Sequence, residues 1–316
     1  MGLQYFKALA DETRLRLANI LLHYELSVNE IVQIMKMGQS RVSRHLKILL
    51  DAGLLVSRRD GLWVFYQTPK AGRARNFLEV ALPFAFPATQ LEGDLALAAK
   101  IMEERVLRAR QFFNSVAEHW EALKTEILGD FDISSSILPI MPSPCDTAVD
   151  LGCGTGGVLS ALRGHARSIV GVDGSPKMLE LCKRRFAAER LPENSISLRI
   201  GELSHLPLAD NEANFACLNL VLHHLPNPAI SLKEVRRIMA PDGLIFLSEF
   251  LRHNDETMRV RYGDHWLGFE EKELAAYLEY AGFELRNISR CPVKNGHALL
   301  LVTAKALPNQ TQTEMQ

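Results

Sequence analysis

The chain has 316 residues, of which 47% are hydrophobic, and a formal net charge of −1. That length allows two domains, each with its own core, and the composition is that of an ordinary soluble protein. Because no apolar run is long enough to span a bilayer and the N-terminus lacks a signal-peptide pattern, we expect a cytoplasmic protein with no membrane partner. The five cysteines form no Cys-x-x-Cys pair, so we predict neither a disulfide framework nor a cysteine metal site.

The near-zero net charge hides a basic segment. Residues 36–76 carry nine basic side chains and two acidic ones, and nine minus two leaves a local charge of +7. An excess of that size on a short segment is typical of a surface that meets nucleic-acid phosphates.

Apolar periodicity and capping residues predict three helices in this part of the chain. The first covers residues 11–22, the second begins with the capping box of Ser27 and Glu30, and the third covers residues 40–52. Two strands follow, 54–59 and 62–67, and the Asp60-Gly61 pair between them is a strong hairpin signal. Three helices and a basic hairpin predict a winged helix-turn-helix over residues 1–70.

The third helix has an apolar face and an opposite face that is small, polar and basic. Serines allow a helix to lie close to a groove floor, and arginine and lysine reach guanine edges or phosphates. The predicted DNA contacts are Gln39, Ser40, Arg41, Ser43, Arg44, His45 and Lys47 of this helix and Arg58 and Arg59 of the hairpin. The alternative is a helical packing domain whose charges are merely solvated.

Residues 9–17 and 40–47 resemble the ArsR family of winged-helix repressors, and the likeness covers about residues 3–70. Metal-sensing members carry Cys-Val-Cys at the start of the second helix, where this chain has Ser27-Val28-Asn29, so we do not expect soft-metal sensing. The resemblance implies a homodimer that binds a palindromic operator in double-stranded DNA.

A connector is predicted over residues 71–110. Pro69, Pro83 and Pro87 are expected to interrupt any long helix there, and residues 95–123 are expected to be helical. This helical segment can pair with its copy in a dimer or pack on its own C-terminal domain, and the sequence leaves both open.

A glycine-rich turn lies between a predicted strand, Thr147 to Leu151, and a predicted helix. Glycine accepts positive φ and lets the backbone approach a ligand closely. Asp150 precedes the turn, and its carboxylate would repel a pyrophosphate but suits a cationic amino-acid tail. A second strand, Ser168 to Val172, ends at Asp173, the position of a ribose-binding acid.

This stretch resembles motif I of class I S-adenosylmethionine (SAM) methyltransferases, with a likeness over residues 111–305. It implies a Rossmann-like α/β domain with an antiparallel edge hairpin, and SAM or S-adenosylhomocysteine (SAH) as the ligand. Glu202 matches the acid that meets the adenine amino group, whereas Met178 could pack on adenine or be plain core. The implied cofactor contacts are Asp150, Gly152, Gly154, Gly156, Asp173, Gly174, Met178, Gly201, Glu202, Leu203 and Asn219. We expect the tail, residues 306–316, to be disordered.

Two adjacent histidines, His223 and His224, follow Asn219 in a run that matches the Val-Leu-His-His-Leu sequence of small-molecule methyltransferases. As neighbours in sequence they are expected to point in different directions, so that only one faces the pocket. That one is a candidate catalytic base or substrate contact, with a structural role as the alternative. The pair alone is not a metal motif.

The leading hypothesis is an ArsR-type transcriptional regulator whose methyltransferase-like domain binds SAM or SAH as effector. The alternative is an active small-molecule methyltransferase with an appended regulatory winged helix. A third hypothesis is a protein-interaction module whose winged helix binds no DNA. The chain lacks an Asn/Asp-Pro-Pro-Tyr/Phe sequence, so amino methylation of DNA bases is disfavoured.

Overall fold

A computed structural model describes residues 2–85, 88–189 and 196–308, and the chain divides into two compact units, 1–106 and 107–316. The boundary falls within helix α6 (Ala88–Val116), inside the segment predicted as a connector. Residues 309–316 of the predicted disordered tail lie outside the described residues. Among the described helices, none is long and apolar enough to cross a membrane.

The first unit is a helix-turn-helix with a hairpin. Its elements are α1 (Gly2–Leu9), α2 (Glu12–His23), β1 (Leu26–Ser27), α3 (Val28–Met35), α4 (Gln39–Asp51), β2 (Val56–Asp60), β3 (Trp63–Gln67) and α5 (Arg73–Ala85). The Asp11 side chain caps α2 by accepting from the Arg14 N–H at 3.1 Å. Ser27 and Glu30 form the predicted capping box at the start of α3. Local capping chemistry therefore fixes where both helices begin.

The hairpin turn lies one residue later than predicted. Asp60 pairs with Trp63 across the strands, so the turn residues are Gly61 and Leu62, and Gly61 has a φ of 57°. The expectation that prolines interrupt every helix of the connector was also wrong for Pro83. It lies in the last turn of α5, which continues to Ala85, while Pro87 lies outside the described residues.

The N-terminal part of α6 is ion-paired to the helix-turn-helix within the first unit. Arg16 of α2 donates two hydrogen bonds to Asp94, at 2.7 and 2.8 Å. Arg105 donates two to Glu30, at 2.9 and 2.6 Å. Bidentate arginine–carboxylate pairs between half-buried or buried groups are specific in geometry. Glu30 therefore serves both the capping box of α3 and the attachment of α6.

The second unit contains, over its described residues, a seven-stranded sheet in the order β6-β5-β4-β7-β8-β10-β9. The strands are β4 (Thr147–Leu151), β5 (Ser168–Asp173), β6 (Ser197–Ile200), β7 (Ala213–Asn219), β8 (Met239–Phe250), β9 (Phe283–Pro292) and β10 (Ala298–Ala306). The first five in chain order pair in parallel and β10 is antiparallel to both of its neighbours. The predicted Rossmann-like sheet with an antiparallel edge hairpin is confirmed.

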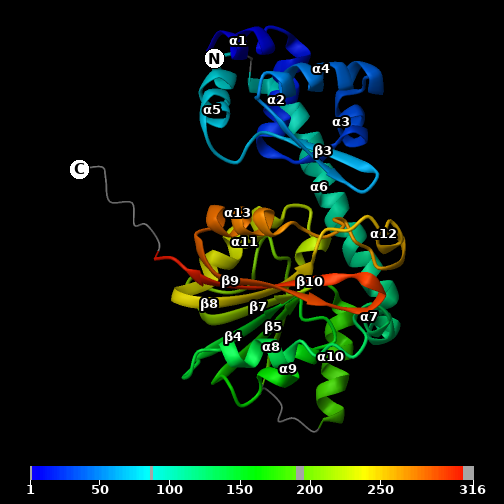
Figure 1. The fold of residues 1–316 in the computed structure, drawn as a ribbon, viewed down its shortest axis with the longest axis vertical. Coiled ribbons are helices and arrows are strands. Elements are labelled where there is room, and N and C mark those ends of the chain that lie inside the picture. The colour runs from blue at the N-terminus through cyan, green and yellow to red at the C-terminus, as the bar shows by residue number, and fades with distance from the viewer. Residues whose placement is uncertain (1, 86–87, 190–195, 309–316) are drawn as a thin grey trace, which may run out of the picture. The chain divides into compact units, whose positions relative to one another are not determined.

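Helices cover both faces of this sheet (Figure 1). On one face lie α11 (Pro228–Ile238) and α13 (Glu271–Ala281), and on the other lie α8 (Ser134–Ile137), α9 (Gly157–Leu162) and α10 (Pro176–Ala188). Two further helices, α7 (Trp120–Leu128) and α12 (Thr257–Arg261), stand at one end of the sheet. The strand order reverses between β4 and β7, where doubly wound sheets open a ligand crevice at the carboxyl ends of the strands.

Residues 240–243 form an irregular stretch within β8. The pairing with β7 shifts register between Ala213, which faces Met239, and Phe215, which faces Leu244. Asp242 has a φ of 64° in this irregular stretch. The extra residues therefore form a local irregularity of the strand, and regular pairing with β7 runs from Leu244 to Ser248.

Candidate functional site

The glycine turn after β4 is closely packed. Gly152, Gly154 and Gly156 all have positive φ, of 76°, 50° and 85°. A Cβ at Gly152 would lie 2.6 Å from Val221 Cγ2, and one at Gly156 would overlap Cys182 Sγ. The turn therefore requires glycine both for its backbone conformation and for its contacts.

Asp173, at the end of β5, holds this turn in place. Its Oδ2 accepts the Gly154 N–H at 2.8 Å, and its Oδ1 accepts the Ser175 N–H at 2.8 Å. Burial raises the pKa of Asp173, although these two hydrogen bonds lower it. One carboxylate thus joins the glycine turn to the start of α10, and its remaining lone pairs are those predicted to meet a ribose.

Glu202 follows the neighbouring strand β6. A Cβ added at Gly174 would lie 3.2 Å from Glu202 Oε1, so the carboxylate lies against the loop after Asp173. Burial raises the pKa of Glu202, Arg110 lowers it and Asp173 raises it further. The structure therefore brings two acids together at the carboxyl ends of adjacent strands. Met178 is 1% exposed and Leu203 is also buried, so both are packed in the core.

Asp150 lies beneath the turn. It is 2% exposed, and the Cys217 thiol donates to its Oδ1 at 3.3 Å. Burial raises the pKa of Asp150 to about 7, while the Cys217 hydrogen bond opposes the rise. A direct contact between Asp150 and a ligand remains a prediction.

The end of β7 bends sharply. Asn219 Oδ1 accepts the Ser248 hydroxyl at 2.6 Å, and the next residue, Leu220, has a φ of 58°. A leucine rarely adopts this left-handed conformation, and such strain concentrates at functional sites. Leu220 lines a cavity beside the bend.

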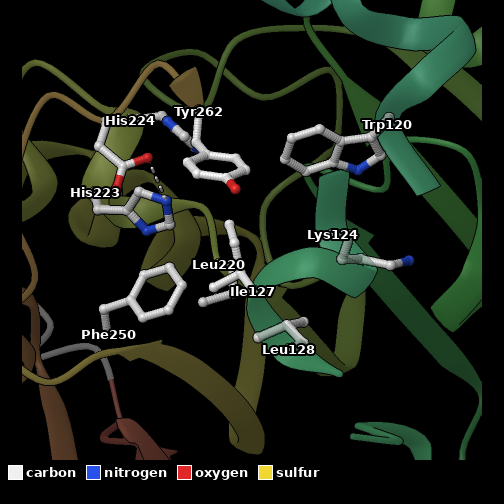
Figure 2. Close-up of a pocket in the computed structure, with 10 residues that line it drawn as sticks. Trp120, Lys124, Ile127, Leu128, Leu220, His223, His224, Phe250 and Tyr262 are labelled. Carbon is white, nitrogen blue, oxygen red and sulfur yellow. Dashed lines mark ion pairs between the residues drawn. The ribbon is translucent and has the colours of Figure 1, made fainter. Parts of the chain in front are cut away.

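Both adjacent histidines line this cavity, whose empty space is about 310 Å³ including the part open to solvent. Figure 2 shows His223 and His224 on one side and Trp120 and Lys124 on the other. The expectation that only one histidine faces the pocket was therefore wrong. The two residues lie in a 3₁₀ turn, Leu222–His224, where neighbours do not alternate as in a strand, and their ring centroids are 4.0 Å apart.

Two buried acids, which the sequence analysis missed, flank His223. Its Nδ1 lies 2.6 Å from Glu249 Oε2, and its Nε2 lies 3.6 Å from Asp264 Oδ1. Burial lowers the pKa of His223, but the charges of Glu249 and Asp264 raise it to about 9. Burial and the neighbouring charge of His223 lower the pKa of His224 well below its ordinary value. A glutamate inside the apolar strand 244–250 was the signal that could have revealed this cluster.

The predicted DNA-contacting residues divide into an exposed and an inward set. His45 Nδ1 lies 3.5 Å from Asp11 Oδ1, and the Arg58 Nε–H donates to Glu25 at 3.1 Å, so both are directed into the domain. Ser43 is half-buried on α4. The exposed residues are Gln39, Ser40, Arg41, Arg44 and Lys47 of α4 and Arg59 of the hairpin.

These features define a protein in which a winged-helix DNA-binding domain is joined to a class I methyltransferase domain. Residues 11–57 match the family model of bacterial regulatory proteins of the arsR family, and residues 149–247 match the methyltransferase domain model. The N-terminal unit therefore contains an ArsR-family domain and the C-terminal unit a methyltransferase domain, as the sequence predicted.

Relatives of both kinds are similar to parts of the chain. Over 124 residues it is 33% identical to the demethylmenaquinone methyltransferase of Lactobacillus johnsonii, covering 38% of this chain and 50% of that protein. Over 63 residues it is 43% identical to the arsenic resistance transcriptional regulator ArsR1 of Pseudomonas putida, covering 20% of this chain and 49% of that protein. The chain thus spans about half the length of these relatives.

The fold also occurs in a solved complex between the Trm112 methyltransferase activator of Haloferax volcanii and a methyltransferase. The similar chain has a TM-score of 0.52 and 19% identity, and the match covers 62% of this chain and 98% of that chain. At this identity the likeness shows the fold alone.

Substitution of Gly152 tests the packing of the turn. Gly152→Ala places a Cβ against Val221 in addition to straining a positive φ, so we expect both a less stable second unit and weaker binding of SAH. Gly164→Ala is the matched control, because its φ is also 76° and a Cβ there meets no described atom within 4 Å. Urea unfolding and calorimetry with SAH compare them, and equal effects of the two variants would contradict the packing argument.

Asp150→Asn tests the burial of that acid. Because the folded pKa of Asp150, about 7, exceeds its ordinary value of 3.8, the fold disfavours its charged form. The wild type should therefore lose stability as pH rises from about 4 to 7. We expect the gain in free energy of unfolding from Asp150→Asn to be about 3 kcal/mol larger at pH 8 than at pH 5. Urea unfolding at both pH values measures this difference, and an equal gain at both would refute the assignment.

Arg44→Ala tests the DNA-facing helix. Loss of one exposed charge on α4 should weaken operator binding roughly tenfold and reduce the slope of log affinity against log salt by about one. Fluorescence anisotropy at several salt concentrations gives both quantities. Arg75→Ala on α5, whose Nε lies 2.8 Å from Glu79, is the control and should leave the slope unchanged. An unaltered, salt-insensitive Arg44→Ala variant would favour the protein-interaction hypothesis.

Proposed function

We propose that the protein is an ArsR-type transcriptional regulator whose methyltransferase domain binds SAM or SAH and thereby changes the affinity for operator DNA. The observation that carries this proposal is the attachment of α6. Its N-terminal part is ion-paired to the helix-turn-helix, and its C-terminal part is hydrogen-bonded to the loop after Asp173.

The residues around the glycine turn fit an adenosyl ligand. Asp173 is fixed by two backbone N–H groups and can still accept hydrogen bonds from ribose hydroxyls. Glu202, at the end of the next strand, can accept from the adenine amino group. Gly174 leaves room beside Glu202 that a Cβ would narrow. When bound, SAM would supply a transferable methyl group, whereas SAH would act as a ligand only.

Asn114 connects this loop to α6. Its Oδ1 accepts the Ser175 hydroxyl at 2.7 Å and the Lys177 N–H at 3.4 Å. Ser175 is itself bonded to Asp173 through its backbone N–H. A ligand that engages Asp173 therefore acts on the segment that Asn114 holds.

Arg105, nine residues earlier on the same helix, bonds Glu30 at the first turn of α3. A change in α6 can therefore reach the capping box of the helix-turn-helix. Coupling of about 1–3 kcal/mol between ligand and operator would suffice for a switch. The proposed place of action is the cytoplasm, on a palindromic operator bound by a homodimer.

An active small-molecule methyltransferase is the second candidate. The cavity beside Leu220, lined by two histidines, supports it. The family resemblance implies that the methionine part of SAM would bind near this strand end, at Asn219. Methyl transfer depends mainly on positioning, so the fold alone does not distinguish turnover from ligand sensing. Transfer of labelled methyl from SAM to a metabolite distinguishes the two.

The regulator proposal is tested by titrating SAH and SAM separately into a mixture of protein and operator DNA. We expect one of them to change operator affinity about 5- to 150-fold. Asp173→Ala should remove nucleoside binding and the response while leaving ligand-free DNA binding intact. Asn114→Ala should still bind nucleoside, measured by calorimetry, but lose most of the response.

Ser115→Ala is the matched control for Asn114→Ala. The Ser115 hydroxyl donates to the backbone carbonyl of Phe112 at 2.7 Å, within α6 itself. Its loss should therefore leave the response unchanged. Unchanged operator affinity with both nucleosides, in protein shown to bind one of them, would reject the regulator proposal.

A further inference from the structure

Three metal-ligating side chains meet in the cavity wall. His223, His224 and Asp264 each offer one ligand atom, and these atoms lie within 4.8 Å of one another. All three residues are buried, so the grouping is not the chance proximity of solvated surface groups. Two histidines and one carboxylate are a donor set used by zinc and by non-haem iron(II) sites.

The spacing suits a bound ion. Two ligand atoms that are each about 2.1 Å from a tetrahedral ion lie about 3.4 Å apart. The distance between His223 Nε2 and Asp264 Oδ1 is 3.6 Å. Small side-chain adjustments would therefore bring these atoms to coordination distance. The backbone carbonyl of His223 also accepts the N–H groups of His265 and Trp266, which ties the loop after Asp264 to the histidine turn.

The groups behind the histidines are those expected around a metal. His223 Nδ1 lies 2.6 Å from Glu249 Oε2, and His224 Nδ1 lies 3.2 Å from Gly263 O. A ligating histidine usually donates its second ring N–H to a carboxylate or backbone carbonyl, which directs the other nitrogen to the ion. Both histidines have such a partner.

The charges also favour a cation. Glu249 is 0% exposed and Asp264 is 5% exposed, and both lie against His223. Buried carboxylates require nearby positive charge or strong hydrogen bonds. A divalent ion would offset both charges at the one place where they converge.

We propose that His223, His224 and Asp264 bind a divalent transition-metal ion, Zn²⁺ or Fe²⁺, with Glu249 as the positioning residue of His223. Because His223 and His224 line the cavity, the remaining coordination positions face it and would hold water or an oxygen or nitrogen group of a ligand. This site does not depend on the proposed regulatory function.

The test uses the full-length protein, stripped with a chelator and titrated without DNA or nucleoside. We expect one equivalent of Zn²⁺, or of Fe²⁺ under anaerobic conditions, to bind per chain. Substitution by Co²⁺ adds a spectroscopic readout, since tetrahedral cobalt absorbs visible light far more strongly than octahedral cobalt. Asp264→Asn and His224→Gln should each weaken binding at least tenfold.

Glu249→Gln gives a sharper result. Glu249 Oε1 accepts the N–H groups of Val221 and Leu222, so the amide oxygen of Gln would keep these bonds and its NH₂ would face His223 Nδ1. The ring proton would then move to Nε2, which blocks ligation. We expect affinity to fall about 10- to 100-fold while circular dichroism shows a folded protein.

His253→Gln is the matched control, a histidine whose ring lies 5.9 Å from that of Phe250 and which is outside the proposed ligand set. The metal affinity of this variant should lie within twofold of the wild-type value. Absence of stoichiometric metal binding by the wild type would overturn the proposal and leave His223 in a purely ionic cluster with its two acids. Binding that survives both Asp264→Asn and His224→Gln would also overturn it, because the ion would then lie elsewhere.

Discussion

The carboxylate of Asp173 is the contact on which the loops at the carboxyl ends of β4 and β5 depend. It is placed where three segments converge, the turn after β4, the end of β5 and the start of α10, and it accepts backbone N–H groups from the first and last of them. A carboxylate in a half-buried position is costly unless its oxygens are bonded. The same bonds that satisfy it therefore fix the positions of these loops, and the Ser175 hydroxyl bonds them to Asn114 of α6.

A second carboxylate organises the histidine cavity in the same way. Glu249 Oε1 accepts the N–H groups of Val221 and Leu222, which anchors the 3₁₀ turn, and its Oε2 meets His223. The strained backbone of Leu220 joins β7 to this turn. Glu249 holds this turn through its backbone, and both histidine rings line the cavity, whereas neighbouring side chains of a strand would point to opposite faces.

Sequence reasoning succeeded where short-range chemistry decides the structure. The capping box of Ser27, the glycine turn and the acid at the end of β5 are set by neighbours within a few residues or by strand order. It failed where distant segments decide. Glu249 lies 26 residues from His223 and Asp264 lies on another loop, so the glutamate within an apolar strand could indicate a buried acid but not which side chains converge on it. The inward position of Arg58 likewise depends on Glu25, 33 residues away.

The glycine turn after β4 and the turn that carries His223 and His224 are in physical contact through Val221. Its side chain occupies the space that a Cβ at Gly152 would need, and its N–H is bonded to Glu249. Val221 therefore links the glycine turn to the turn that carries the histidines. Two adjacent residues of α6 contact these regions. Asn114 accepts a hydrogen bond from Ser175 in the loop after Asp173, and the Phe113 ring lies 4.7 Å from that of His224. Helix α6 therefore contacts both the loop after Asp173 and the histidine turn.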